Sequence, residues 1–474
     1  MRKILFFFFL TISLSSFSQI EDAWVFLKDK PNKTIFLENP LTMLSQRALD
    51  RRNRQNIIVD EKDVPIDANY LNQLKNDESI VVLGKSKWLN AVHIQGTVAH
   101  INNLISNFTF IASTEFANKS LHVSGKKRLK PITPNHQHKF LSKKTDFTYG
   151  SAENQIKMLK GDFLHEQGLT GNGQIIAVID AGFPNVNTLP AFKRIRDQNQ
   201  ILGGYNFADR NNNFYTRDRH GTLVLSTIAG YLEDEFVGTA PDAKFYLFIS
   251  EIAETETVLE ETLWVEAAER ADSLGVDVIN TSLGYTTFDN PNHSYSYEDM
   301  DGKTTFISRG AEIGASRGML VVNSIGNSGS ESWKYMGAPA DAKSVISVGA
   351  VNSARNIASF SSFGPTSDNR IKPEILAQGL NSVVIDDESG QISTLNGTSF
   401  SSPIMAGLIA CLNGNTAFAL KTNSNFKSKL SDNLNNFLKN AVYQSSDKFL
   451  NPTNQYGYGI PDFEQALYIY QTSL

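Results

Sequence analysis

The stretch Ile175-Ile176-Ala177-Val178-Ile179-Asp180 is an apolar run that ends in a carboxylate. Together with Gln174 it forms the first of five such strand candidates; the others span residues 243–250, 276–283, 319–325 and 344–351. Amphipathic helical patterns lie between them at 223–231, 258–274 and 306–317. Continuous apolar runs are typical of strands buried on both faces, and alternation with helices implies parallel strands. We therefore predict an α/β fold with a doubly wound, mainly parallel sheet over residues 150–474.

The composition is that of an ordinary globular protein. The 474 residues are 41% hydrophobic and 20% charged, with a formal net charge of −5. This balance gives no support for a nucleic-acid partner, which would require a basic face. The single cysteine, Cys411, excludes an intramolecular disulfide and a zinc or redox site built on a cysteine pair. We expect Cys411 to be a buried thiol in the core.

The N-terminus carries an export signal. Arg2 and Lys3 precede an apolar run that small residues extend to Phe17. Ser16-Phe17-Ser18 is a small-x-small motif, which predicts cleavage after Ser18. This is the pattern of a signal peptide over residues 1–18. The run is too short to cross a bilayer. We expect a secreted protein, extracellular or in the cell envelope, with no membrane span.

Two segments separate the signal peptide from the predicted sheet. Residues 19–120 contain short strand-like runs and helix-capable stretches, which predict a small α+β domain. Residues 121–149 contain a basic run from Lys126 to Lys144 with prolines and histidines. We interpret this run as a solvated linker, where proteases cut, and expect the maturation site there.

Polar residues at the ends of the predicted strands are the candidate chemical groups, because ligands of an open parallel sheet bind beyond the carboxyl ends of its strands. Asp180 ends the first strand, and His220 opens an apolar helix. Asn327 lies in a glycine-flanked turn, and Ser399 lies at a helix N-terminus. Each has a plain structural explanation as a turn or helix-cap residue.

Two other enzyme classes fail on the spacing of glycines. A dinucleotide-binding fold needs Gly-x-Gly-x-x-Gly after the first strand, and no such motif follows Asp180. An α/β-hydrolase needs Gly-x-Ser-x-Gly, but position 401 is serine.

In the order Asp180, His220, Asn327, Ser399, the four stretches resemble the subtilisin-like serine peptidases. The resemblance covers about residues 150–465, and the blocks His220-Gly221-Thr222 and Gly397-Thr398-Ser399 are its most specific parts. The sequence departs from the family pattern at Leu223, where relatives have a second histidine, at Gln378, where they often have proline, and in the residues after Ser399.

The resemblance implies a role for each residue. Ser399 would be the nucleophile, His220 the general base, Asp180 the group that orients the imidazole, and Asn327 the oxyanion-hole donor. Two segments would bind the substrate backbone and form the walls of the S1 pocket: Ser282, Leu283 and Gly284, and Ser324, Ile325 and Gly326. Their apolar and glycine content suggests an uncharged P1 residue. The implied function is a secreted serine endopeptidase that hydrolyses polypeptides through an acyl-enzyme.

Further implications concern partners and cofactors. Residues 19–120 look like a diverged propeptide, an intramolecular inhibitor that is later removed; a retained binding domain is the rival interpretation. The enzyme is expected to be a monomer that needs no cofactor for its chemistry. A structural calcium ion is compatible with the family, with Asp299 and Asp301 as candidate ligands, but a solvated acidic turn is preferred. A peptide ligase or macrocyclase and a non-catalytic pseudopeptidase are the alternative functions.

Overall fold

The computed structural model describes residues 19–121, 147–422 and 434–473. The predicted signal peptide and most of the predicted linker therefore lie outside the described residues. No helix in the described ranges is both long enough and apolar enough to span a membrane.

Seven parallel strands form the central sheet, in the order β13-β12-β11-β10-β5-β9-β6. Their bounds are β5 (Ile175–Asp180), β6 (Ile201–Asn206), β9 (Lys244–Ile249), β10 (Val278–Thr281), β11 (Leu320–Ser324), β12 (Ile346–Val351) and β13 (Ile375–Gln378). Ile176 and Val178 enter one apolar core, whereas Ala177 and Ile179 enter the other. Both faces are therefore buried, which confirms the predicted α/β sheet. β6 and β13 escape sequence detection because the first contains Gly203-Gly204 and the second has four residues.

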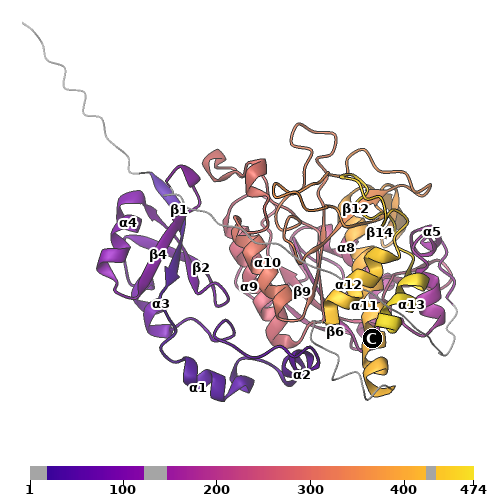
Figure 1. The fold of residues 1–474 in the computed structure, drawn as a ribbon, viewed down its shortest axis with the longest axis horizontal. Helices are drawn as coiled ribbons and strands as arrows, with labels where there is room; N and C mark the ends of the chain where they lie inside the picture. Colours follow the sequence, from indigo (N-terminus) through magenta and orange to yellow (C-terminus); the bar gives the residue numbers. More distant parts are fainter. Residues whose placement is uncertain (1–18, 122–146, 423–433, 474) are drawn as a thin grey trace, which may run out of the picture.

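Helices cover both faces of this sheet (Figure 1). Helices α8 (His220–Ala229) and α11 (Thr398–Thr422) pack on one face, and α9 (Leu259–Leu274) and α10 (Phe306–Ser316) pack on the other. The remaining helices are α5 (Glu153–Lys157), α6 (Gly161–Glu166), α7 (Lys193–Asp197), α12 (Leu434–Gln444) and α13 (Phe463–Ser473). α8 begins three residues before its predicted start, which places His220 in its first turn. Two antiparallel pairs flank the sheet: β7 (Tyr231–Leu232) with β8 (Phe236–Val237), and β14 (Ser382–Ile385) with β15 (Ile392–Leu395).

The N-terminal domain is a four-stranded antiparallel sheet with the order β2-β3-β1-β4. The strands are β1 (Ile20–Leu27), β2 (Ile80–Ser86), β3 (Ala91–Thr97) and β4 (Ile111–Phe116), and the helices are α1 (Lys33–Glu38), α2 (Gln46–Arg54), α3 (Ala68–Lys75) and α4 (Val98–Asn107). It has its own apolar core, to which Val25, Val92 and Leu104 contribute. The predicted α+β class is therefore confirmed.

One face of this small sheet docks on α9 and α10 (Figure 1). The Trp24 ring stacks on Phe306 with centroids 4.8 Å apart, and its Nε1 donates to Thr262 Oγ1 at 3.0 Å. Glu269 Oε1 accepts hydrogen bonds from Ser86 Oγ at 2.7 Å and from the Trp88 backbone N–H at 2.9 Å. The docked face therefore uses both aromatic packing and hydrogen bonds to a buried glutamate.

Helix α2 makes a second contact, at the C-terminal end of α9. Arg51 and Arg52 both pair with the Asp272 carboxylate, and Arg52 also holds Asp63 through two bonds of 2.6 and 2.8 Å. All four side chains are at most 2% exposed. Because each charge has a partner, the network is stable in place, but removal of one member leaves a buried charge uncompensated.

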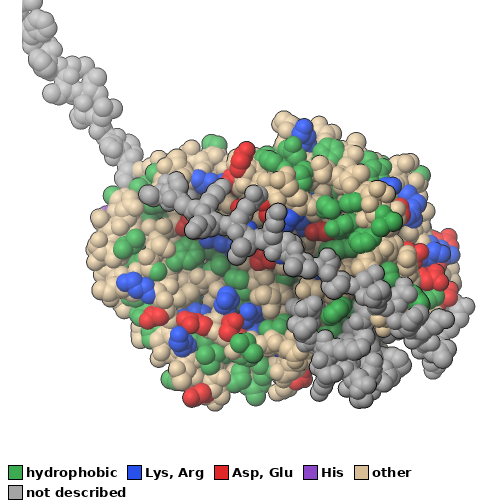
Figure 2. All heavy atoms as spheres, viewed as in Figure 1, with side chains coloured by type: hydrophobic (Ala, Val, Ile, Leu, Met, Phe, Trp, Pro, Cys, Tyr) green, Lys and Arg blue, Asp and Glu red, His purple; other side chains and the backbone are tan. Residues whose placement is uncertain are grey.

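On the face shown in Figure 2, acidic and basic side chains are interspersed rather than gathered by sign.

Asp272→Asn should destabilise the full chain by about 3–5 kcal/mol, because two buried guanidinium groups would lose their shared carboxylate. Lys33→Ala breaks an exposed pair with Glu61, whose partners are each 47% exposed, and should change stability by less than about 1 kcal/mol. Urea unfolding of both variants checks this expectation. Equal midpoints for Asp272→Asn and the unmodified chain would contradict it.

Candidate active site

Asp180 and His220 meet where β5 ends and α8 begins. His220 Nδ1 lies 2.7 Å from Asp180 Oδ1, and the same oxygen accepts the Ala181 N–H at 2.8 Å. Asp180 is 1% exposed, whereas His220 is 31% exposed. The carboxylate is therefore fixed and buried, and the imidazole reaches solvent.

This close approach depends on a glycine after the histidine. A Cβ at Gly221 would lie 2.3 Å from the Gly182 carbonyl oxygen and 3.0 Å from Asp180 Cβ. Any larger residue would push α8 away from the end of β5. The glycine in the His-Gly-Thr block is therefore required by packing.

The charges around His220 favour its protonated form. Burial by itself lowers the pKa of His220, but the Asp180 carboxylate and its hydrogen bond, with smaller contributions from Glu251 and Asp218, outweigh burial and raise the pKa to about 9. Above this pKa the imidazole is neutral and can accept a proton from a neighbouring group, and the Asp180 carboxylate stabilises the imidazolium that results.

Ser399 is the second residue of α11. Its side-chain hydroxyl donates to the Ser282 carbonyl oxygen at 3.4 Å. In the part of the chain that the structure describes, this hydroxyl makes no hydrogen bond to His220. Such bonds are often long in unliganded enzymes. The ring of the next residue, Phe400, lies 6.3 Å from the His220 ring between centroids. Ser399 therefore lies in the neighbourhood of the Asp180–His220 pair.

A proline in α11 leaves the Ser399 carbonyl free to accept a hydrogen bond from a neighbouring loop. Pro403 lies inside α11 and has no N–H to donate to the Ser399 carbonyl, four residues earlier. Ser282 Oγ donates to that carbonyl instead, at 2.9 Å. Ser282 and Ser399 are thus linked through hydrogen bonds in both directions.

Asn327 is held next to the same helix. Its Oδ1 accepts the Thr398 N–H at 2.9 Å and the Thr398 hydroxyl at 3.0 Å. Because the amide oxygen of Asn327 is bonded to α11, the amide nitrogen points away from that helix. The Asn327 side chain is exposed, so this nitrogen is free to donate to a ligand. An oriented amide donor and the N-terminus of α11 can together stabilise a negative oxygen.

The two predicted walls of the substrate pocket also come together. Asn323 Nδ2 donates to the Leu283 carbonyl at 3.0 Å and to the Ser324 carbonyl at 2.7 Å, which ties the two walls. A Cβ at Gly284 would lie 3.8 Å from Gly337 Cα, and one at Gly326 would lie 4.0 Å from the Gly337 nitrogen. Gly337 was not identified from the sequence, since it reaches this place only through the fold.

Asp299 and Asp301, the candidate calcium ligands, already have partners within the protein. Asp299 pairs with Lys119 and accepts the Ser296 N–H, while Asp301 accepts the N–H groups of Lys303 and Thr304. Among the residues that the structure describes, no cluster of three or more His, Cys, Asp or Glu side chains could hold a metal ion.

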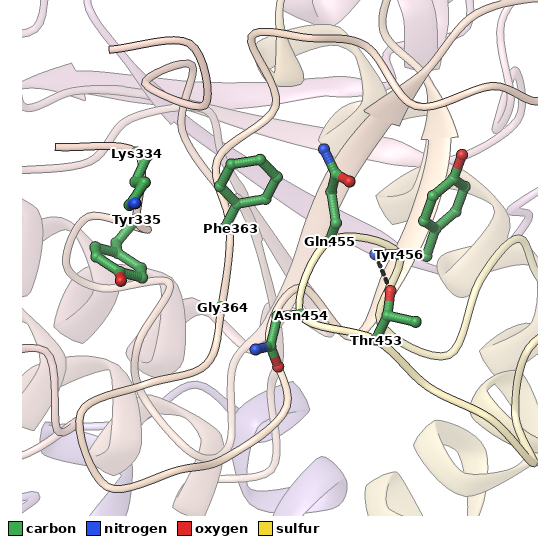
Figure 3. Close-up of a pocket in the computed structure, with 8 residues that line it drawn as sticks. All are labelled: Lys334, Tyr335, Phe363, Gly364, Thr453, Asn454, Gln455 and Tyr456. Atoms are coloured by element: carbon green, nitrogen blue, oxygen red, sulfur yellow. Dashed lines mark hydrogen bonds between the residues drawn. The ribbon is translucent and has the colours of Figure 1, made fainter. Parts of the chain in front are cut away.

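A separate pocket of about 520 Å³ lies beside the loop that follows Asn327 (Figure 3). None of the site residues predicted from the sequence lines it. Its lining residues are Lys334, Tyr335, Phe363, Gly364, Thr453, Asn454, Gln455 and Tyr456.

Comparison with known proteins agrees with this geometry. Residues 171–459 match the model of the Subtilase family, and residues 22–135 match the Peptidase S8 propeptide domain of Bacteroidota. The chain is 31% identical to Subtilisin DY of Bacillus licheniformis over 54% of its own length and 82% of the relative's. It is 32% identical to Subtilisin BL of Lederbergia lenta over 66% of its own length and 97% of the relative's. A solved structure titled "Structure of Prenylagaramide maturation protease PagA" aligns with a TM-score of 0.48 and 20% identity, over 67% of this chain and 98% of that one.

The chain therefore belongs to the subtilase family. It is a serine-type endopeptidase with an N-terminal propeptide domain, as the sequence resemblance implied.

Asp180→Asn should lower the pKa of His220 from about 9, because burial would remain while the main opposing charge is lost. NMR titration of the histidine ring protons measures this change. Asp197→Asn, on an exposed pair with Lys193, is the matched control and should leave the titration unaltered. A His220 titration that is the same in both variants would rule out Asp180 as its main partner.

Proposed function

We propose that this chain is a secreted endopeptidase that cleaves polypeptides through an acyl-enzyme on Ser399. The hydrogen bond between Asp180 and His220, beside the N-terminus of α11, is the observation on which the proposal rests. The same helix end carries both Ser399 and the residue that orients Asn327.

The proposed reaction begins with attack by Ser399 Oγ on the P1 carbonyl carbon. His220 Nε2 takes the hydroxyl proton as the new C–O bond forms, and Asp180 stabilises the resulting imidazolium. His220 then gives this proton to the leaving amine as the peptide bond breaks. Water repeats the attack on the ester and releases the product. Asn327 Nδ2 and the Ser399 N–H would stabilise the oxyanion in both steps.

The walls of the pocket support an uncharged P1 residue. Leu283 and Ile325 are apolar, and glycines at 284, 326 and 337 bring the two segments close together without a charged side chain. The dock between Trp24 and Phe306 supports the N-terminal domain as the chain's own inhibitor. Export by the signal peptide and removal of residues 19 to about 121–149 complete the proposal.

A fluorophosphonate probe should label the matured enzyme at Ser399, and Ser399→Ala should abolish the labelling. Ser402→Ala is the matched control in the same helix, since Ser402 Oγ bonds Asn280 instead, and it should still be labelled. Mass spectrometry of the labelled peptide identifies the site. A folded, matured enzyme that takes up no probe would refute the proposed nucleophile.

The secreted enzyme should begin at a residue between about Leu121 and Tyr149, because the basic linker is the expected cleavage region. N-terminal sequencing of the secreted product measures this directly. A product that begins at Gln19 and is fully active would instead support a retained binding domain.

A further inference from the structure

The loop that follows β9 brings a glutamate to the Asp180–His220 pair. Ile249 is the register partner of Asp180, and the Ser250 N–H donates to the Asp180 carbonyl at 3.1 Å. Glu251 is the next residue, and its side chain is partly exposed. β9 therefore delivers a carboxyl group to the sheet edge at which His220 reaches solvent.

This edge carries more negative charge than its own cations neutralise. Asp180, Asp218 and Glu251 all act on the one imidazole of His220. The two nearest arginines in sequence are already engaged. Arg217 pairs with Asp209 and Glu254, and Arg219 pairs with Asp386 and Asp387. Burial, and then the Asp180 charge, raise the pKa of Glu251 well above its usual range, while His220, which Glu251 shares with Asp180 and Asp218, acts in the opposite direction.

A buried hydroxyl group with no hydrogen-bond partner in the described part of the chain lies on the segment that follows the proposed substrate wall. Tyr285 is 1% exposed, and its Oη has no hydrogen-bond partner among the described residues. The side chains whose charges act on this phenol are Glu251, Glu260, Glu256 and Glu261, with Glu251 first among them, and with burial they raise the pKa of Tyr285. Tyr285 directly follows Gly284 in the segment proposed to bind the substrate backbone. The buried phenol therefore lies near the same carboxyl group.

We propose that Glu251 is a specificity-determining residue that binds the cationic side chain, lysine or arginine, of the substrate residue immediately before P1. This inference rests on the proposed function, since it places a peptide along the segments at 282–284 and 324–326. Successive side chains of an extended chain point to opposite faces. With the P1 side chain between the glycine-bearing walls, the preceding side chain points to the other face, beside His220 and Glu251.

A guanidinium or ammonium group beside Glu251 supplies a positive charge to this group of carboxylates. It donates to the Glu251 carboxylate, and the charge-assisted bond holds the substrate backbone next to Ser399. The pocket for P1 remains uncharged. One subsite therefore selects an uncharged side chain, and the other selects a positively charged one.

The chain's own sequence contains a substrate of this kind. Residues 122–146, between the N-terminal domain and the described start of the peptidase domain, hold seven basic residues and one acidic residue, Asp146. The basic residues are Lys126, Lys127, Arg128, Lys130, Lys139, Lys143 and Lys144. The segment expected to be cut during maturation is thus complementary in charge to the edge of the site.

The test compares kcat/KM for fluorogenic peptides that are identical except for arginine, leucine or glutamate before an uncharged P1 residue. For the enzyme matured from the full chain, arginine should exceed leucine by about 10- to 100-fold. Glu251→Gln should bring this ratio close to 1, Glu251→Asp should retain part of it, and Glu251→Lys should favour glutamate. Glu254→Gln is the matched control, because Glu254 is in the same loop but 76% exposed, and the preference for arginine should persist.

Two outcomes would overturn the inference, and they are distinguishable. Equal kcat/KM for arginine and leucine in an enzyme whose Ser399 takes up the fluorophosphonate, or a ratio that Glu251→Gln leaves unchanged, refutes the role of Glu251 alone. If no peptide is cleaved and Ser399 is not labelled, the proposed function fails, and this inference fails with it.

Discussion

A parallel sheet buried on both faces is the constraint on which the rest of this structure depends. The side chains of β5 alternate between two apolar cores, so a charged group on that strand is tolerated only at its end. Asp180 occupies that end, and neighbouring strands β10 and β11 end at the same edge, beside Ser282 and Ser324. Charged side chains of β5 are therefore confined to this edge, because both faces of the strand pack in apolar cores. The close contact of α8 with the edge, permitted by Gly221, then brings an imidazole to the buried carboxylate.

The N-terminal domain docks on the peptidase domain through buried polar groups as well as through aromatic packing. α9 presents Thr262, Glu269 and Asp272 to that domain, and each bonds it through a side chain. In isolation these residues would be assigned to a solvated helix face. Their burial is favourable only while Trp24, Ser86 and the α2 arginines supply the partners. The interface is therefore specific in its hydrogen bonding as well as in its shape, as expected of a domain that must fit one peptidase.

Much of this could be predicted from the sequence, because the signals were local. Apolar runs located five of the seven strands, and the strand-end principle identified Asp180 and Asn327. The same principle could have found Glu251, which follows the run at 243–250 directly. Gly337 and the Arg52–Asp272 contact could not be found, since they join segments far apart in the chain. The acidic turn with Asp299 and Asp301 resembles a metal loop in sequence, yet its carboxylates are taken by Lys119 and by nearby amides.

The proline in α11 affects which substitutions near Ser399 the enzyme can accept. A proline inside a helix normally costs about 3 kcal/mol, partly because it leaves a carbonyl without a partner. Here that carbonyl belongs to Ser399 and accepts a hydrogen bond from Ser282 Oγ, in a segment predicted to form a wall of the substrate pocket. The segment with Ser282 and the helix that carries Ser399 are therefore linked by hydrogen bonds. A substitution at residue 282 would remove the hydrogen bond that satisfies the Ser399 carbonyl, so a change made there for selectivity would also act on the helix that carries the proposed nucleophile.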